Sequence, residues 1–130
     1  MEAALIAKLL ASSGVTALVS TRINWDRRPQ GEPLPAVVLH LIDGVPDVTH
    51  GGASGLRVSR VQVDCDAASR KAAKAIARAI ETAVTAQTFT QGAVRFDVIL
   101  IVDERDTTFD ETTPLFRTSL DLMVHSANAS

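Results

Sequence analysis

The most constraining feature of this sequence is a change in the spacing of its apolar residues near position 66. Residues 56–66 alternate polar with β-branched or other apolar side chains, which predicts a strand. Residues 67–84 repeat their apolar side chains about every 3.6 positions, which predicts an amphipathic helix. Asp66 stands at the junction, and we expect it to cap the helix by accepting from the first-turn N–H groups. A strand covered by the helix that follows it is the nucleus of an α/β layer.

Length and composition narrow the possible fold and function classes of the protein. The 130 residues fit a single domain, residues 1–130, of which we expect residues 126–130 to be a disordered tail. With 46% apolar but only 4% aromatic residues, the core should be tightly packed and lack large ring-lined pockets. A net charge of −2 gives no overall field that favours nucleic acid or anionic lipid.

The N-terminal residues and the single cysteine bear on targeting and on redox chemistry. The first ten residues contain Glu2 and Lys8, so they match neither a signal peptide nor a membrane span. Cys65 is the only cysteine, which excludes an intrachain disulfide and fits a reducing cytoplasm. Its place late in an apolar strand predicts an unreactive core thiol.

The remaining segments predict two further helical regions and three strands. Residues 5–10 have helical spacing, and residues 15–23 are expected to be irregular with one helical turn. Three prolines and one glycine within residues 24–35 predict an ordered loop. Apolar runs predict strands over residues 36–42, 94–102 and 116–124.

Two details of these segments are specific enough to test. In the segment 94–102 we expect one face to carry Val94, Phe96, Val98, Leu100 and Val102, and both faces to be at least partly covered. Residues 85–92 are expected to be a polar connection and residues 103–114 an acidic loop.

The predicted fold class is α+β. It has a single layer of about four strands packed with two helices, in the order helix, strand, strand, helix, strand, strand. The strands on either side of the central helix are parallel if they are neighbours. The sheet is therefore mixed, or antiparallel if the strand order separates that pair.

No group of residues in the sequence has the pattern of a catalytic or metal site. His40, His50 and His125 fall on separate segments, and no serine lies in a nucleophile elbow. The acidic segment lacks the regular ligand positions of a calcium loop. We therefore expect no catalytic residue, no metal and no cofactor, and the chain is predicted not to be an enzyme. A small metal-binding or ligand-binding enzyme that uses His40, His50 and the acidic segment is the alternative from another class.

Two loops have features of protein interfaces. Trp25 lies among arginines in the proline-rich loop, so Trp25, Arg27 and Arg28 are candidate interface residues. Packing of Trp25 over its own sheet is the alternative. The glycine-rich loop at residues 43–55 is longer than a hairpin requires, and it adds Asp47, Val48 and His50 to the candidates. The basic face of the central helix is expected to be solvated; it carries Arg70, Lys71, Lys74 and Arg78.

The sequence resembles the phage tail completion family, also described as tail terminator or tail-to-head joining proteins. The resemblance rests on an N-terminal helix and on an arginine- and proline-rich loop that ends Gly31-Glu32-Pro33-Leu34-Pro35 before an apolar strand. It continues in Arg60-Val61-Gln62-Val63-Asp64-Cys65-Asp66, which leads into an alanine-rich helix, and in two closing strands. It covers nearly the whole chain.

The resemblance implies a structural virion protein that caps the tail tube as a hexameric ring and joins it to the head connector. The implied partners are other copies of the chain, the tail tube protein, a head connector or adaptor protein, and DNA that passes through the channel without specific binding; no membrane partner is implied. The implied location is the virion tail or neck, assembled in the cytoplasm of a bacterial host. A head-tail adaptor or other neck ring protein is the nearest alternative. Phage, prophage and gene transfer agent all remain open as the source.

The acidic segment then has a possible place in such a ring. A channel lined with carboxylates repels phosphate and lets DNA slide. We therefore expect these acids to face the channel: Asp103, Glu104, Asp106, Asp110 and Glu111.

Overall fold

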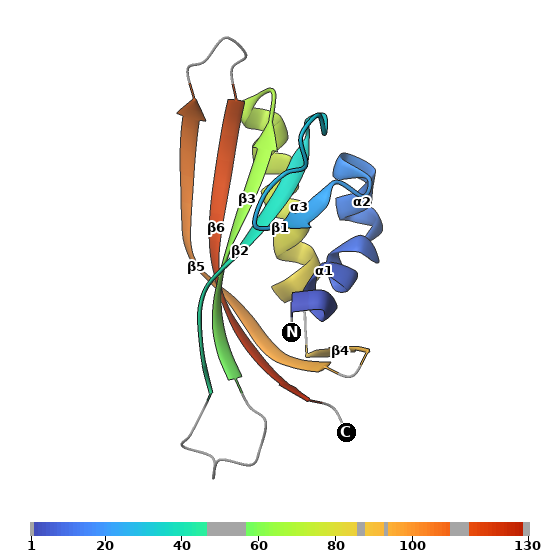
Figure 1. Ribbon diagram of the computed structural model, residues 1–130, viewed down its shortest axis with the longest axis vertical. Helices are drawn as coiled ribbons and strands as arrows, with labels where there is room; N and C mark the ends of the chain where they lie inside the picture. The colour runs from blue at the N-terminus through green and yellow to red at the C-terminus, as the bar shows by residue number, and fades with distance from the viewer. Residues whose placement is uncertain (1, 47–56, 86–87, 93, 110–114, 129–130) are drawn as a thin grey trace.

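A computed structural model describes residues 2–46, 57–85, 88–92, 94–109 and 115–128. Within these residues, helices and strands follow one another in the order shown in Figure 1. The helices are α1 (Glu2–Leu10), α2 (Ser13–Val19) and α3 (Arg70–Thr85). The strands are β1 (Ile23–Trp25), β2 (Ala36–Pro46), β3 (Arg57–Ala67), β4 (Phe89–Gln91), β5 (Val94–Phe109) and β6 (Leu115–Asn128).

The six strands form one sheet in the order β1-β2-β3-β6-β5-β4. Every neighbouring pair is antiparallel except β1 and β2, which are parallel, so the sheet is mixed. The sheet curls into a half-barrel, and the three helices lie on its inner side (Figure 1). We call the opposite side of the sheet the outer face.

The predicted strand-to-helix nucleus is present, but its two strands are not neighbours. Helix α3 links β3 to β4 and β5, and β6 lies between β3 and β5. Because β3 and β5 each pair antiparallel with β6, they run in the same direction without sharing hydrogen bonds. Another strand thus separates the pair, a case for which we expected an antiparallel sheet; the sheet is mixed instead because β1 pairs parallel with β2.

The core lies between the inner side of the sheet and the helices. Ile76 and Ile80 of α3 are almost fully buried. They belong to one cluster with Val61 and Val63 of β3 and Leu120 of β6. Alanines on the same side of α3 let the helix approach the sheet closely, which fits a core low in aromatic residues.

The expectation of about four strands and two helices is wrong. The structure adds two strands of three residues each, β1 and β4. Such short strands show no readable alternation and form because a longer neighbour offers an unpaired edge. The packing of Phe89 in β4 against Phe96 in β5, with ring centroids 4.7 Å apart, also holds β4 in place.

The irregular segment expected at residues 15–23 is mostly helical. Helix α2 begins after Ser12, whose side chain accepts from the N–H of Val15. Val15 and Val19 are fully buried one turn apart, so tertiary packing stabilises a helix that is too short to be stable alone. No single helix in the described residues is long and apolar enough to cross a membrane; only α1 and α2 together reach that length and composition, and they are bent by 82°.

Two boundaries at the C-terminal half also differ from expectation. Residues 103–109 continue strand β5 instead of forming a loop. Strand β6 runs to Asn128, and both Ser126 and Ala127 are buried, so residues 126–128 are not a frayed tail. Of the acidic residues expected in the loop, Asp110 and Glu111 lie outside the described part of the chain.

Strand β5 is also not a simple alternation. Register shifts between Phe96 and Val98, and between Ile101 and Asp103, break its two-residue period. Phe96 and Ile99 are therefore buried on the inner side, whereas Val98, Leu100 and Val102 are each at least 41% exposed. These three side chains are thus covered only in part.

Asp66 does not cap the central helix. Strand β3 continues to Ala67, and α3 begins at Arg70. The cap is Ser69, whose Oγ accepts from the N–H of Ala72 at 3.1 Å. Ser69 and Asp66 have similar capping preference in sequence, and the length of the strand decides between them.

We predict that Ser69→Ala lowers the free energy of unfolding by about 1 kcal/mol, because the first turn of α3 loses its side-chain acceptor. Ser69→Asp keeps an acceptor and should lose much less. Urea denaturation followed by circular dichroism measures both. Equal losses in the two variants would contradict a capping role.

Candidate assembly surfaces

The proline-rich loop is held firmly to its own chain. The guanidinium of Arg22 donates from Nε to the carbonyl of Pro35 at 2.7 Å. Inside the loop, the Asn24 amide donates to the carboxylate of Glu32 at 3.0 Å. These contacts close the two ends of the loop, so its tip has a defined position next to β1 and β2.

Trp25 packs on its own chain. Its indole Nε1 donates to the backbone carbonyl of Glu2 at 3.1 Å, and its ring packs against the core cluster. Trp25 thus fastens the first turn of α1 to the end of β1. The structure shows the packing alternative, and whether the remaining exposed part of the ring also meets another chain stays a prediction.

Arg27 and Arg28 differ from Trp25 because both are exposed. Neither guanidinium group forms a hydrogen bond or ion pair with any residue in the described part of the chain, although the backbone N–H of Arg27 donates to the carbonyl of Trp25 at 2.9 Å. They line a groove of about 380 Å³ on the outer face. The groove floor includes His40, Asp64 and Arg117.

The outer face carries a row of buried carboxylates. Asp64, Asp66 and Asp121 are each at most 5% exposed, although they lie on the side of β3 and β6 away from the helices. Buried carboxylates are stable only when they are paired or hydrogen-bonded. Each of the three has such partners on a neighbouring strand.

Arg117 is the cation for two of these acids. Its guanidinium contacts both carboxylate oxygens of Asp66, at 2.7 and 3.1 Å. It also lies 3.8 Å from Asp64, which in turn accepts from Ser119 at 2.7 Å and lies 3.1 Å from His40. The carboxylates hold the pKa of Arg117 above its usual range, with the hydrogen bond to Asp66 the largest cause.

Asp121 has two cations of its own. Arg105 donates to it at 3.0 Å from β5, and Arg60 donates to it at 3.0 Å from β3. The hydrogen bond from Arg105 is the largest cause that lowers the pKa of Asp121. Because β6 lies between β3 and β5, one carboxylate ties three strands together.

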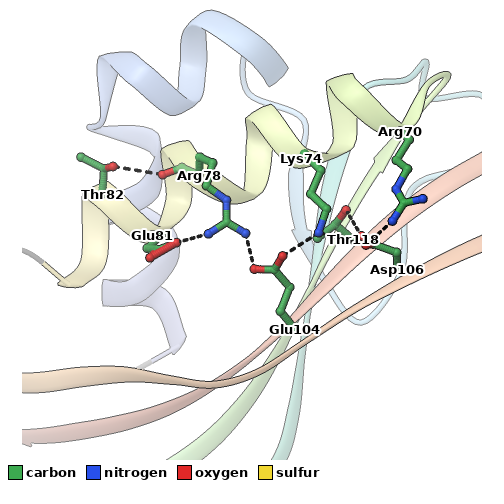
Figure 2. Close-up of polar contacts among 8 residues, drawn as sticks. All are labelled: Arg70, Lys74, Arg78, Glu81, Thr82, Glu104, Asp106 and Thr118. Atoms are coloured by element: carbon green, nitrogen blue, oxygen red, sulfur yellow. Dashed lines mark hydrogen bonds and ion pairs between the residues drawn. The ribbon is translucent and has the colours of Figure 1, made fainter.

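The inner side has a second ionic network, which joins α3 to β5 (Figure 2). Lys74 donates to Glu104 at 2.6 Å and lies 2.9 Å from Asp106. Arg70 pairs with Asp106 at 3.1 Å, and Arg78 pairs with Glu104. The basic face of the helix is therefore largely paired with β5, and the expectation that it is only solvated is wrong for these three cations.

This network shifts the pKa values of its members. The hydrogen bond from Lys74 is the largest cause that lowers the pKa of both Glu104 and Asp106. The hydrogen bond to Glu104 is the largest cause that raises the pKa of Lys74 and of Arg78. Both carboxylates therefore stay charged below the pH at which free acids protonate.

Comparison with known proteins identifies the family. A family model described as Tail completion protein gp17 matches residues 3–125. The chain belongs to this family. The family consists of structural proteins of phage tails, so this tail completion protein is a structural virion protein and not an enzyme.

The fold is also present in a solved particle. A chain in the structure of the virion of a native gene transfer agent (GTA) particle is similar over 98% of this chain and 95% of that chain, with a TM-score of 0.70. The two sequences are 22% identical, so the likeness shows a shared fold. The comparison with curated protein sequences gave no match.

The structure separates the candidate residues of this tail completion protein. Arg27 and Arg28 lie together at the groove, Asp103 lies on the outer face beside Arg105, and Glu104 and Asp106 face α3. Three loop candidates, Asp47, Val48 and His50, lie outside the described residues. The lumen-facing role of the acids stays a prediction, because no ring is present in the structure.

His40, His125 and Cys65, the histidines and the cysteine in the described part of the chain, give no sign of a chemical site. His40 contacts Asp64 and His125 lies on β6, and no group of three metal-binding side chains occurs among the described residues. Cys65 is buried, and its burial raises the pKa of the thiol far above the usual range, which keeps it unreactive.

Sequence reasoning missed the buried ionic row, although a signal for it was present. In β3 the charged residues Arg60, Asp64 and Asp66 occupy alternate positions, opposite in orientation to Val61 and Val63. The same alternation occurs in β6 with Arg117 and Asp121. Charges of opposite sign at matching positions of two strands indicate cross-strand pairs once the strand order is known.

We predict that Trp25→Ala lowers the free energy of unfolding by about 2 to 3 kcal/mol, because it removes a half-buried ring and the hydrogen bond to Glu2. Trp25→Phe keeps most of the ring and should lose about 1 kcal/mol. Urea denaturation followed by circular dichroism is suitable, since Trp25 is the only tryptophan. An unchanged stability in Trp25→Ala would show that the ring does not hold α1.

We predict that Lys74→Met costs about 1 kcal/mol at neutral pH, because the cation lies at a partly exposed site. It should also flatten the loss of stability in acid. The lowered pKa values of Glu104 and Asp106 contribute stability that is present above their ordinary values of 4.5 and 3.8 and is lost as the pH falls through the lower folded-state values.

The matched control for this prediction is Lys71→Met, which removes an exposed cation one turn away on the same helix. Lys71 has no ion pair with any described residue, so its removal should leave the pH profile unchanged. Thermal unfolding between pH 2 and about 5 compares the two variants. Parallel profiles for wild type and Lys74→Met would contradict the role of this network.

Proposed function

We propose that this tail completion protein is a tail terminator. It caps the tail tube as a ring, a hexamer as the family resemblance implies, and joins the tube to the head connector while leaving a channel for DNA. Its partners are other copies of the chain, the tail tube protein and a connector or adaptor protein. The protein would act in the virion tail or neck after assembly in a bacterial cytoplasm.

The observation that carries this proposal is the family match, which spans residues 3–125 and hence both sides of the sheet. The fold shared with a chain of a gene transfer agent virion is consistent with it. The described surface is also more typical of a protein that binds other proteins than of a protein that binds a small molecule. The groove beside Arg27 and Arg28 has a floor of paired charged groups, without a large apolar surface.

The acidic segment is a separate part of the proposal. We propose that it lies at the channel, where negative charge prevents DNA from sticking. Glu104 and Asp106 are neutralised by cations of α3, and Asp103 pairs with Arg105. The repulsion therefore falls mainly to Asp110 and Glu111, which lie outside the described residues. An electron microscopy map of the ring with this segment on its outer rim would reject this placement.

We expect particles made without this protein to carry tails of irregular, extended length that are not attached to heads. The reason is that a tube without a cap keeps adding subunits. Negative-stain electron microscopy measures tail length and the fraction of tails with heads. Tails of normal, uniform length in the absence of the protein would contradict a terminator role.

Complementation tests the arginine loop in the same assay. Arg27→Glu combined with Arg28→Glu should fail to restore joined particles, because both arginines are exposed and unpaired among the described residues. The matched control is Lys71→Glu, which reverses an exposed cation on another surface and should restore them. If this protein cross-links only to the head connector and the tails have normal length, the result would instead favour a head-tail adaptor.

A further inference from the structure

The sheet of this protein has two open edges in the described residues. Strand β1 pairs with β2 only at residues 37–39, and β4 pairs with β5 only at residues 94–96. Beyond these short strands, the edge of the sheet is open. There, residues 40–46 of β2 and residues 97–109 of β5 pair with no further strand in the described chain. An open edge presents unpaired backbone N–H and C=O groups to any strand that approaches.

The exposed apolar side chains gather on these same stretches. Leu41 and Ile42 on β2 are 41% and 52% exposed. On β5, Val98, Leu100 and Val102 are 41%, 49% and 49% exposed. Among the described residues, the other large apolar side chains with comparable exposure are Leu10 and Leu18, both on helices. A long open edge with apolar side chains is a site for pairing with another chain.

The two edges lie at the same height of the sheet. Leu41 of β2 is opposite Val61 of β3, which is opposite Leu122 of β6, which is opposite Ile101 of β5. The open part of β2 therefore lies level with residues 97–103 of β5, where the exposed apolar side chains are. Two copies placed side by side, without a shift along the strands, bring these stretches together.

The strand directions also fit. Three antiparallel steps separate β2 from β5, so the two strands run in opposite directions. If neighbouring copies share one orientation, β5 of one copy meets β2 of the next as an antiparallel pair, which continues the alternation of the sheet. A head-to-tail contact that repeats by rotation without a shift closes into a ring instead of a filament.

The charges near the two edges are complementary. Asp103 on β5 is opposite Asp121, which is opposite Gln62, which is opposite His40 of β2. His40 lines the same groove as the exposed Arg27 and Arg28. Asp103 pairs with Arg105 of its own strand, but its side chain is still 47% exposed. At its level, the next copy presents the guanidinium groups of Arg27 and Arg28, which have no partner in the described part of their own chain.

We propose that residues 97–103 of β5 in one copy pair with residues 40–46 of β2 in the next copy and that this head-to-tail strand pairing builds the ring. Asp103 lies opposite the loop with Arg27 and Arg28 across this contact. The inference deepens the proposed function and rests on it, since it names the surfaces through which the ring forms.

Site-directed cross-linking tests the pairing directly. A variant with both Ile42→Cys and Leu100→Cys places one thiol on each edge at adjacent levels. With a short bis-maleimide and assembled tail tubes, we expect a ladder of covalent multimers on a denaturing gel. Each single variant should stay monomeric, because the two edges are different surfaces. Wild type is the blank, since Cys65 is buried.

The outcomes separate the inference from the proposed function. If wild type and the double variant cap the tubes as rings but no ladder forms, the strand pairing is wrong and the terminator role stands. A covalent dimer from Leu100→Cys alone would show β5 paired with β5, which also overturns the head-to-tail contact. If wild type forms no ring on the tubes, the proposed function fails, and the inference fails with it.

Charge substitutions give an independent test. Leu100→Lys should abolish the ring without lowering the unfolding midpoint, because it places a charge at the shared edge of an otherwise intact fold. Leu18→Lys is the matched control on α2, where the side chain is 37% exposed, and it should keep the ring. Asp103→Lys should weaken the ring, and Arg27→Asp with Arg28→Asp in the same chain should restore it in part. Light scattering in the presence of tubes measures all four, and a ring unaffected by Leu100→Lys would overturn the inference.

Discussion

The structure depends on α3, which binds the sheet through two different faces. Its apolar face buries Ile76 and Ile80 against β3 and β6, and a fully buried side chain of this size contributes about 1.5 to 3 kcal/mol. Its basic face pairs with Glu104 and Asp106, and each such partly exposed pair contributes at most about 1 kcal/mol. Packing therefore holds the helix on the sheet, and the ion pairs fix where β5 lies over it.

The outer face shows how a two-sided sheet keeps a single register. A slip of one residue would move Asp64 and Asp66 into the apolar core and expose Val63 and Cys65. Buried ion pairs add little net stability compared with apolar residues of similar size, but breaking one is costly. The contacts of Arg117 with β3 and of Asp121 with both of its neighbours thus favour one alignment over its alternatives. A subunit that must present fixed edges benefits from such an alignment.

The same strands connect the fold to the proposed assembly. The register shifts in β5 turn Phe96 and Ile99 inward and leave Val98, Leu100 and Val102 exposed, on a stretch of β5 whose free edge pairs with no described strand. The short strands β1 and β4 cover only part of the two edges. Exposed apolar side chains and unpaired strand edges do not stabilise a monomer, whereas a ring subunit can bury the side chains and pair the edges against its neighbours. The proposed contacts therefore use edges and apolar side chains that the described part of the isolated chain leaves uncovered.

The sequence by itself determined the long elements, because the periods of 2 and about 3.6 residues in β3 and α3 follow from burial of one face and are readable over ten or more positions. It also contained the family resemblance, and hence the structural role. Only the tertiary structure decided the short elements β1, β4 and α2, the shifts in β5, and the partners of Trp25, Asp66 and Lys74. These features depend on which distant segments become neighbours, since a three-residue strand or a buried carboxylate is stable only beside a particular partner. The order β3-β6-β5 is such a fact: it brings together charges that lie far apart in the chain, and no local pattern specifies it.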